Sequence, residues 1–182
     1  MRVIAGEKKG MGLFGPPKSG RTRPTKDQVK ESVFNMLGPV APGLVFLDLF
    51  AGTGQMGIEF LSRGGQKAIF IEQSGPMVGM IKRNLAKTAY ESQALLLHGD
   101  YRQRLDDIGG LVDVVYVDPP YGLNMVGEAL SLLRTKQVLK PGALVIVEAS
   151  VEDGGEIAEG FRLLREKTQK LTRIQFLQEA FL

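Results

Sequence analysis

Two turns rich in glycine or proline hold the residues with the clearest chemical potential. The first is Gly52-Thr53-Gly54, which Gly57 extends to G-x-G-x-x-G, and it follows an apolar run at 44–50. Such a turn between a strand and a helix lets the backbone approach a ligand at the helix N-terminus. The second is Asp118-Pro119-Pro120-Tyr121, at the end of the apolar run 112–118. Both turns indicate a ligand site built where strands end.

Asp48, four residues before Gly52, distinguishes between two kinds of ligand that glycine turns bind. A carboxylate beside the turn repels the pyrophosphate of a dinucleotide such as NAD. It attracts the ammonium and sulfonium groups of S-adenosylmethionine, which the turn therefore favours. We predict that this cofactor binds at the segment Asp48, Phe50, Ala51, Gly52, Thr53 and Gly54.

Two further carboxylates follow the next apolar runs. Glu72 ends the run 67–72, where its carboxylate is placed to accept hydrogen bonds from both ribose hydroxyls of an adenosyl group. Asp100 follows the run 94–97 and is predicted to accept from the adenine amino group, with Tyr101 beside it. Asp100 also suits the N-cap of a following helix, and the two roles are compatible.

The Asp-Pro-Pro-Tyr turn predicts methyl transfer to an exocyclic amine of a nucleobase. Such an amine is a poor nucleophile because its lone pair is delocalised into the ring. Consecutive prolines fix the backbone, so the Pro119 carbonyl and the Asp118 carboxylate can accept both N–H bonds of one amine. This directs the lone pair at the sulfonium methyl, while Tyr121 stacks on the base. We predict that Asp118, Pro119, Pro120 and Tyr121 are catalytic.

An alternation of strands and helices must position these residues. We predict strands at 44–50, 67–72, 94–97, 112–118 and 143–148, and helices at 55–63, 76–88, 101–108 and 124–139, with a turn at 140–142. Strands that are apolar on both faces and joined by helices predict a parallel sheet covered on each side. The tail, 161–167 and 171–179, alternates in polarity and predicts a final antiparallel pair.

The N-terminal segment carries the positive charge. Its short apolar runs, 2–5 and 11–14, predict a hairpin, and 26–37 predicts a helix. Residues 1–30 contain eight Lys or Arg against two acidic residues, a net charge of +6, whereas the remaining 152 have a net charge of −3. A concentrated basic segment suits a phosphate backbone, although a solvated terminus fits the charge equally well. We expect a basic arm at 1–24 and a single methyltransferase domain at 25–182.

Composition excludes several other classes of site. The 182 residues include no cysteine and one histidine, His98, which excludes disulfides, thiolate zinc sites and multi-histidine metal sites. We therefore expect no metal. No apolar run approaches the roughly 20 residues of a membrane-spanning helix, and no signal peptide is apparent. A cytoplasmic protein with no membrane association is expected.

With these motifs in place, the chain resembles class I methyltransferases, and more specifically the bacterial RsmD-type 16S ribosomal RNA guanine-N2 methyltransferases. The resemblance extends over nearly the whole length, and Arg23-Pro24-Thr25 narrows it to this family. It rests on residues 1–6, 23–31, 34–37, 48–54, 57–59, 61–64, Glu72, Asn84 and 118–121.

The resemblance implies a Rossmann-like class I methyltransferase fold of seven mostly parallel strands, with an added N-terminal β-hairpin and helix. It implies transfer of a methyl group from S-adenosylmethionine to the N2 amine of a guanine in 16S rRNA, in the small ribosomal subunit or its assembly intermediate. The residues expected to bind RNA are Arg2, Lys8, Lys9, Lys18, Arg21, Arg23 and Thr25.

Other functions share parts of this pattern. A DNA adenine or cytosine amino-methyltransferase would use the same chemistry, but no separate target-recognition domain fits after the catalytic core. A protein glutamine methyltransferase usually has Asn in place of Asp118 and does not need a basic arm. A noncatalytic ribosome-assembly factor would not need to retain Asp118 and the cofactor carboxylates.

Overall fold

Seven strands form one central sheet in the order β3-β2-β1-β4-β5-β7-β6. The computed structural model describes residues 1–16, 25–110, 112–120, 125–153 and 157–180. Strands β1 to β5 are parallel, and β7 pairs antiparallel with both β5 and β6. The strands are β1 Val45–Asp48, β2 Lys67–Glu72, β3 Ala94–His98, β4 Val112–Val117, β5 Leu139–Ser150, β6 Phe161–Gln169 and β7 Thr172–Glu179. The predicted parallel sheet and final antiparallel pair are confirmed.

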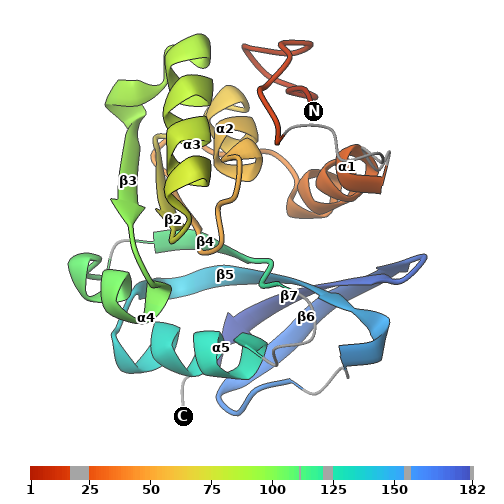
Figure 1. Cartoon of the computed structure of the whole chain (residues 1–182). Coiled ribbons are helices and arrows are strands. Elements are labelled where there is room, and N and C mark those ends of the chain that lie inside the picture. Colours follow the sequence, from red (N-terminus) through yellow and green to blue (C-terminus); the bar gives the residue numbers. More distant parts are fainter. Residues whose placement is uncertain (17–24, 111, 121–124, 154–156, 181–182) are drawn as a thin grey trace.

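Helices cover both faces of this sheet, as expected for strands that are apolar on each side. Figure 1 shows α1, α2 and α3 on one side, with α4 and α5 on the other. The helices are α1 Thr25–Leu37, α2 Gln55–Ser62, α3 Gly75–Thr88, α4 Tyr101–Arg104 and α5 Met125–Thr135. Short 3-10 turns occupy Glu91–Gln93, Leu105–Asp107 and Val151–Asp153.

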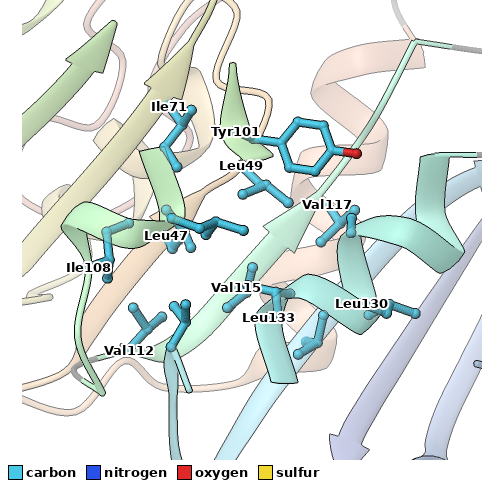
Figure 2. Close-up of a cluster of buried hydrophobic side chains, with 14 of the residues drawn as sticks. Leu47, Leu49, Ile71, Tyr101, Ile108, Val112, Val115, Val117, Leu130 and Leu133 are labelled. Atoms are coloured by element: carbon cyan, nitrogen blue, oxygen red, sulfur yellow. The ribbon is translucent and has the colours of Figure 1, made fainter. Parts of the chain in front are cut away.

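Alternate residues of each strand enter different hydrophobic clusters. On β1, Leu47 packs under α4 and α5 in the cluster of Figure 2, whereas Phe46 packs under α1 and α2. Val115 and Val114 of β4 divide in the same way. Because side chains alternate along a strand, every second residue towards the strand end shares a face with Phe46 or with Leu47. This alternation decides where the polar residues that end the strands point.

The predicted boundaries around β5 are wrong. Helix α5 ends at Thr135, and β5 begins at Leu139. The predicted turn at 140–142 is instead an irregular part of β5, where the pairing with β4 shifts register between Val112 and Val114. Pro141 has no N–H to donate to a ladder, so a proline is tolerated at such an irregularity. The helix predicted at 101–108 likewise ends at Arg104 and continues as a 3-10 turn.

The N-terminal hairpin packs on the domain rather than extending from it. Val3 and Leu13 are buried in a cluster with α2 and α3, and the hairpin closes by hydrogen bonds such as Val3 N–H to the Met11 carbonyl at 2.9 Å. The buried Glu59 carboxylate accepts hydrogen bonds from the backbone N–H groups of Ile4 at 2.8 Å and Ala5 at 3.0 Å. A polar anchor and an apolar one therefore both fix this segment on α2.

Gly57 allows α2 to lie directly against β2. A Cβ atom at Gly57 would lie 2.3 Å from Phe70 Cε1, well inside van der Waals contact. We expect Gly57→Ala to lower the free energy of unfolding by about 1–3 kcal/mol, because overpacking displaces neighbouring side chains. Urea denaturation measures this change.

Gly127 on α5 provides the matched control. A Cβ atom there meets nothing within 4 Å, so Gly127→Ala should stabilise the protein by up to about 1 kcal/mol through helix propensity. Equal responses of the two variants would contradict the close approach at Gly57.

Candidate active site

Three carboxylates meet where neighbouring parallel strands end. Asp48 is the last residue of β1 and lies opposite Tyr116 of β4. Glu72 is the last residue of β2, next to β1, and Asp118 immediately follows β4 on the other side. Parallel strands all have their carboxyl ends at the same end of the sheet. The glycine turn and the Asp-Pro-Pro segment therefore both lie at this carboxyl end, which we call the sheet edge.

The strand alternation gives Asp48 and Asp118 the same face. Asp48 has the parity of Phe46, and Asp118 has the parity of Tyr116, whose ring packs in the cluster under α1 and α2. Glu148 of β5 follows Ile146 of that cluster by two residues and lies on the same side. The sheet edge therefore gathers acidic groups on the face that α1 and α2 cover.

Glu72 fixes the shape of the glycine turn. Its carboxylate accepts from the Gly52 N–H at 2.8 Å and from the Ser74 N–H at 2.7 Å. Gly52 and Gly54 have φ values of 54° and 76°, in the left-handed region that favours glycine. A Cβ atom at Gly52 would meet nothing within 4 Å, so this side of the turn is open. Both Glu72 oxygens retain a lone pair for a ligand hydroxyl.

Asp48 is a buried residue with an unsatisfied hydrogen-bond acceptor. Its side chain is 2% exposed, and its Oδ2 has no hydrogen-bond partner within the described part of the chain. Burial, together with the Glu72 carboxylate, raises the pKa of Asp48 to about 7, although the Gly57 N–H opposes the shift. A cationic ligand group beside this carboxylate would lower its pKa again. The unpaired oxygen therefore fits the cofactor class predicted from the sequence.

Gln55 was not singled out in the sequence. It follows Gly54 as the first residue of α2, and its Oε1 is also buried without a hydrogen-bond partner in the described ranges. A polar residue directly after a glycine turn is the signal that could have identified it. Its amide adds a second unsatisfied acceptor at the start of α2.

Asp100 caps α4, as the sequence suggested. Its carboxylate accepts from the Arg102 N–H at 2.8 Å and from the Arg102 guanidinium at 3.0 Å. Arg102 also makes two hydrogen bonds to Glu128, at 2.7 and 2.8 Å, and this lowers the pKa of Glu128. The Tyr101 hydroxyl donates to the same carboxylate at 2.9 Å, and its ring lies 4.9 Å from that of Phe50. Arg102 and Glu128 therefore hold Asp100 and Tyr101 in place.

Tyr101 is part of the core as well as of the sheet edge. Figure 2 shows its ring near Leu49 and Val117, with the hydroxyl directed away from the cluster. Burial and the hydrogen bond to Glu128 raise the pKa of Tyr101 to about 12, so the hydroxyl remains a donor.

A buried tyrosine supports the predicted catalytic segment. Asp118 is half-buried, Pro119 buried and Pro120 exposed, directly after β4. Tyr116, two residues before Asp118, donates its hydroxyl hydrogen bond to Glu148. Burial, followed by the carboxylates of Asp118 and Glu148, raises the pKa of Tyr116 well above its ordinary value. Tyr116 therefore stays protonated beside the acidic cluster.

Asn84 joins the hairpin to the glycine turn. This fully buried side chain accepts from the Phe14 N–H at 2.7 Å and donates to the Phe14 carbonyl at 3.0 Å. It also donates to the Thr53 carbonyl at 2.9 Å. One side chain thus ties together two segments that are distant in sequence.

The predicted RNA-binding residues have different environments. Arg2 and Lys9 are exposed, whereas Lys8 pairs with Glu7 at 2.7 Å and lies over the Tyr90 ring. Thr25 begins α1. The remaining residues of that set, and one predicted catalytic residue, fall outside the described residues: Lys18, Arg21, Arg23 and Tyr121.

The described residues contain neither a cluster of metal-binding side chains nor a membrane-spanning helix. No group of three His, Cys, Asp or Glu side chains there could hold a metal ion. In the same part of the chain, no helix has the length and apolar character needed to span a membrane.

A family model described as conserved hypothetical protein 95 matches residues 1–178. The chain belongs to this family. It is 35% identical over 181 residues to the ribosomal RNA small subunit methyltransferase D of Haemophilus influenzae, covering 98% of this chain and 93% of that protein. It is also 35% identical to the protein of the same name from Escherichia coli, covering 92% and 84%.

A solved structure of the Escherichia coli protein yhhF has a TM-score of 0.87 and 31% identity, covering 99% of this chain and 98% of that one. These matches confirm the resemblance identified in the sequence. They also confirm the Rossmann-like class I methyltransferase fold.

The burial of Asp48 predicts that the stability difference between the wild type and Asp48→Asn depends on pH. Between about pH 4 and 7, the unfolded carboxyl is ionised while the folded one retains its proton, so ionisation favours unfolding. The unfolding free energy of the wild type should therefore fall relative to Asp48→Asn as the pH rises to about 7, by at most about 1.4 kcal/mol per pH unit, and then level off.

Urea denaturation of both proteins at several pH values gives this difference directly. Titrating groups that do not interact with Asp48 are common to both chains and cancel. Parallel stability curves for the two proteins would show that the Asp48 pKa is not raised.

Proposed function

We propose that this protein transfers a methyl group from S-adenosylmethionine to the N2 amine of a guanine in 16S rRNA, within the small ribosomal subunit or its assembly intermediate. The observation that carries the proposal is the meeting of two turns at one sheet edge. The glycine turn follows β1, and the Asp118-Pro119-Pro120 segment follows the adjacent β4. The names of the relatives support RNA of the small ribosomal subunit as the substrate.

The residues at the ends of β1, β2 and β3 suit the cofactor. When bound, S-adenosylmethionine supplies an electrophilic methyl group. Asp48, with its unpaired oxygen, favours a cationic group, and Glu72 offers acceptors for ribose hydroxyls. The residues proposed to border the cofactor are Asp48, Phe50, Ala51, Gly52, Thr53, Gly54, Glu72, Asp100 and Tyr101.

Asp118 and Pro119 are proposed to orient the guanine amine. The half-buried Asp118 carboxylate accepts one amine N–H and the Pro119 carbonyl accepts the other. Two fixed acceptors localise the nitrogen lone pair and stabilise the positive charge that develops on nitrogen as the new bond forms. Pro120 restrains the backbone of this segment, and Tyr121 is proposed to stack on the base.

The basic N-terminal segment is proposed to hold the RNA while the domain at 25–182 carries the reaction. Within the arm at 1–24, the exposed Arg2 and Lys9 present charge on a hairpin that Glu59 fixes to α2. A fixed hairpin binds phosphates at a smaller entropic cost than a free terminus. We place this activity in the cytoplasm.

Asp118→Ala tests the proposed chemistry. The variant should bind S-adenosylmethionine with unchanged affinity while kcat falls by about a hundredfold or more, because one acceptor for the amine is removed. Calorimetry measures the binding, and transfer of labelled methyl to RNA measures kcat. Asp107→Ala, which removes an exposed carboxylate paired with Arg104, is the matched control. Equal turnover of the two variants would refute the role of Asp118.

The substrate is tested in cells. Mass spectrometry of 16S rRNA nucleosides from cells with and without the gene should show less N2-methylguanosine in its absence, because one guanine stays unmodified. Complementation with the wild-type chain should restore the signal, and the Asp118→Ala chain should not. An unchanged nucleoside profile would exclude this substrate and favour DNA or protein amines.

A further inference from the structure

We propose that Arg83 and Lys87 on α3, gathered around the exposed ring of Phe14, bind phosphates of the RNA substrate. The proposal rests on the proposed function and extends the RNA-binding surface from the N-terminal arm onto the domain. These residues were not among those predicted from the charge of the first 30 residues.

The charged side chains of helix α3 are all positive. Gly75–Thr88 contains Lys82, Arg83 and Lys87 and no acidic residue. All three cations are exposed, whereas the opposite side of the helix buries residues such as Ile81 and Leu85. The body of the protein is acidic on balance, so this local concentration of positive charge is distinctive.

Both cations contact the ring of Phe14. Its ring is 37% exposed, with the Arg83 guanidinium carbon 4.2 Å and the Lys87 Nζ 4.8 Å from the ring centroid. Asn84, on the buried side of the same helix, holds the backbone of Phe14 by two hydrogen bonds. The Phe14 ring therefore holds the two cationic groups close together, and its own backbone is fixed by Asn84.

This pair lacks the carboxylate partners that three other exposed or half-exposed cations of the domain have. Arg104, Lys136 and Lys140 each pair with an aspartate at 2.5–3.1 Å. Across the described ranges, neither Arg83 nor Lys87 forms such a salt bridge. Like charges four residues apart on a helix destabilise it by about 0.2–0.5 kcal/mol. An external anion between them would remove this repulsion.

The surface adjoins both the arm and the cofactor turn. Lys8 lies over Tyr90, just beyond the end of α3. Asn84, which holds the backbone of Phe14, also donates a hydrogen bond to the Thr53 carbonyl of the glycine turn. RNA held at Arg83 and Lys87 would thus continue from the hairpin towards the sheet edge. Continuity with the basic arm and with the proposed catalytic segment favours RNA over an acidic protein partner, because one phosphate backbone can contact all of these regions.

Charge removal tests this surface. The double variant R83Q/K87Q should bind a 16S rRNA fragment about tenfold more weakly at about 0.1 M salt. The slope of log affinity against log salt should fall by about 1 to 2, as expected for two lost phosphate contacts. In methyl-transfer assays, KM for RNA should rise with kcat and cofactor affinity unchanged.

Two further double variants serve as controls. R162Q/K170Q removes the same charge from exposed residues of β6 and the following turn, at the opposite edge of the sheet from β3, and should bind RNA normally. R83K/K87R keeps both charges and should also bind normally. Equal RNA affinity and salt slope for R83Q/K87Q and R162Q/K170Q would overturn the proposal.

The outcomes also separate this inference from the proposed function. If the wild-type protein methylates no RNA or ribosomal subunit, the proposed function fails before the surface is tested. If it methylates RNA and R83Q/K87Q equals its control, the surface alone is refuted. Normal binding of R83Q/K87Q to naked RNA, with weak binding to the subunit, would assign the surface to a ribosomal protein and would also refute the proposal.

Discussion

Strand β1 lies between β2 and β4, and its parallel register with both determines the relative positions of the glycine turn, Glu72 and the Asp-Pro-Pro segment. It aligns Asp48 with Tyr116, so the turn after β1 and the segment after β4 emerge side by side. The register is maintained by continuous apolar strands buried between two helical layers. A shift by one residue would move Asp48 to the opposite face of the sheet, where α4 and α5 pack.

Glu59 of α2 and Asp48 of β1 are both buried carboxylates, but they differ in whether their charge is compensated by neighbouring groups. Glu59 is fully buried and accepts from two backbone N–H groups, with Lys30 and Arg63 as ionic partners, so its charge is compensated. Asp48 is similarly buried but has an oxygen without a partner and a raised pKa. Uncompensated burial is costly, and a ligand can offset that cost. Glu59 fastens the hairpin, whereas Asp48 offers a place for a cofactor.

The hairpin, α3 and the glycine turn behave as one connected unit. Asn84 bonds Phe14 on one side and Thr53 on the other, and the Phe14 ring gathers Arg83 and Lys87. The proposed RNA-binding surface and the proposed cofactor site therefore both contact α3.

The sequence by itself determined the alternation of strands and helices, the glycine turn and the Asp-Pro-Pro segment, because periodicity and turn chemistry are local properties. It did not determine the course of β5 around Pro141, since the bulge depends on pairing with β4. Only the tertiary structure decided that Asp48 is buried with an unpaired oxygen and that Asn84 links the hairpin to the turn. It alone brought Arg83 and Lys87 over the ring of Phe14. The hydrogen bond between Phe14 and Asn84 spans 70 positions and that between Asn84 and Thr53 spans 31, so no local pattern encodes them.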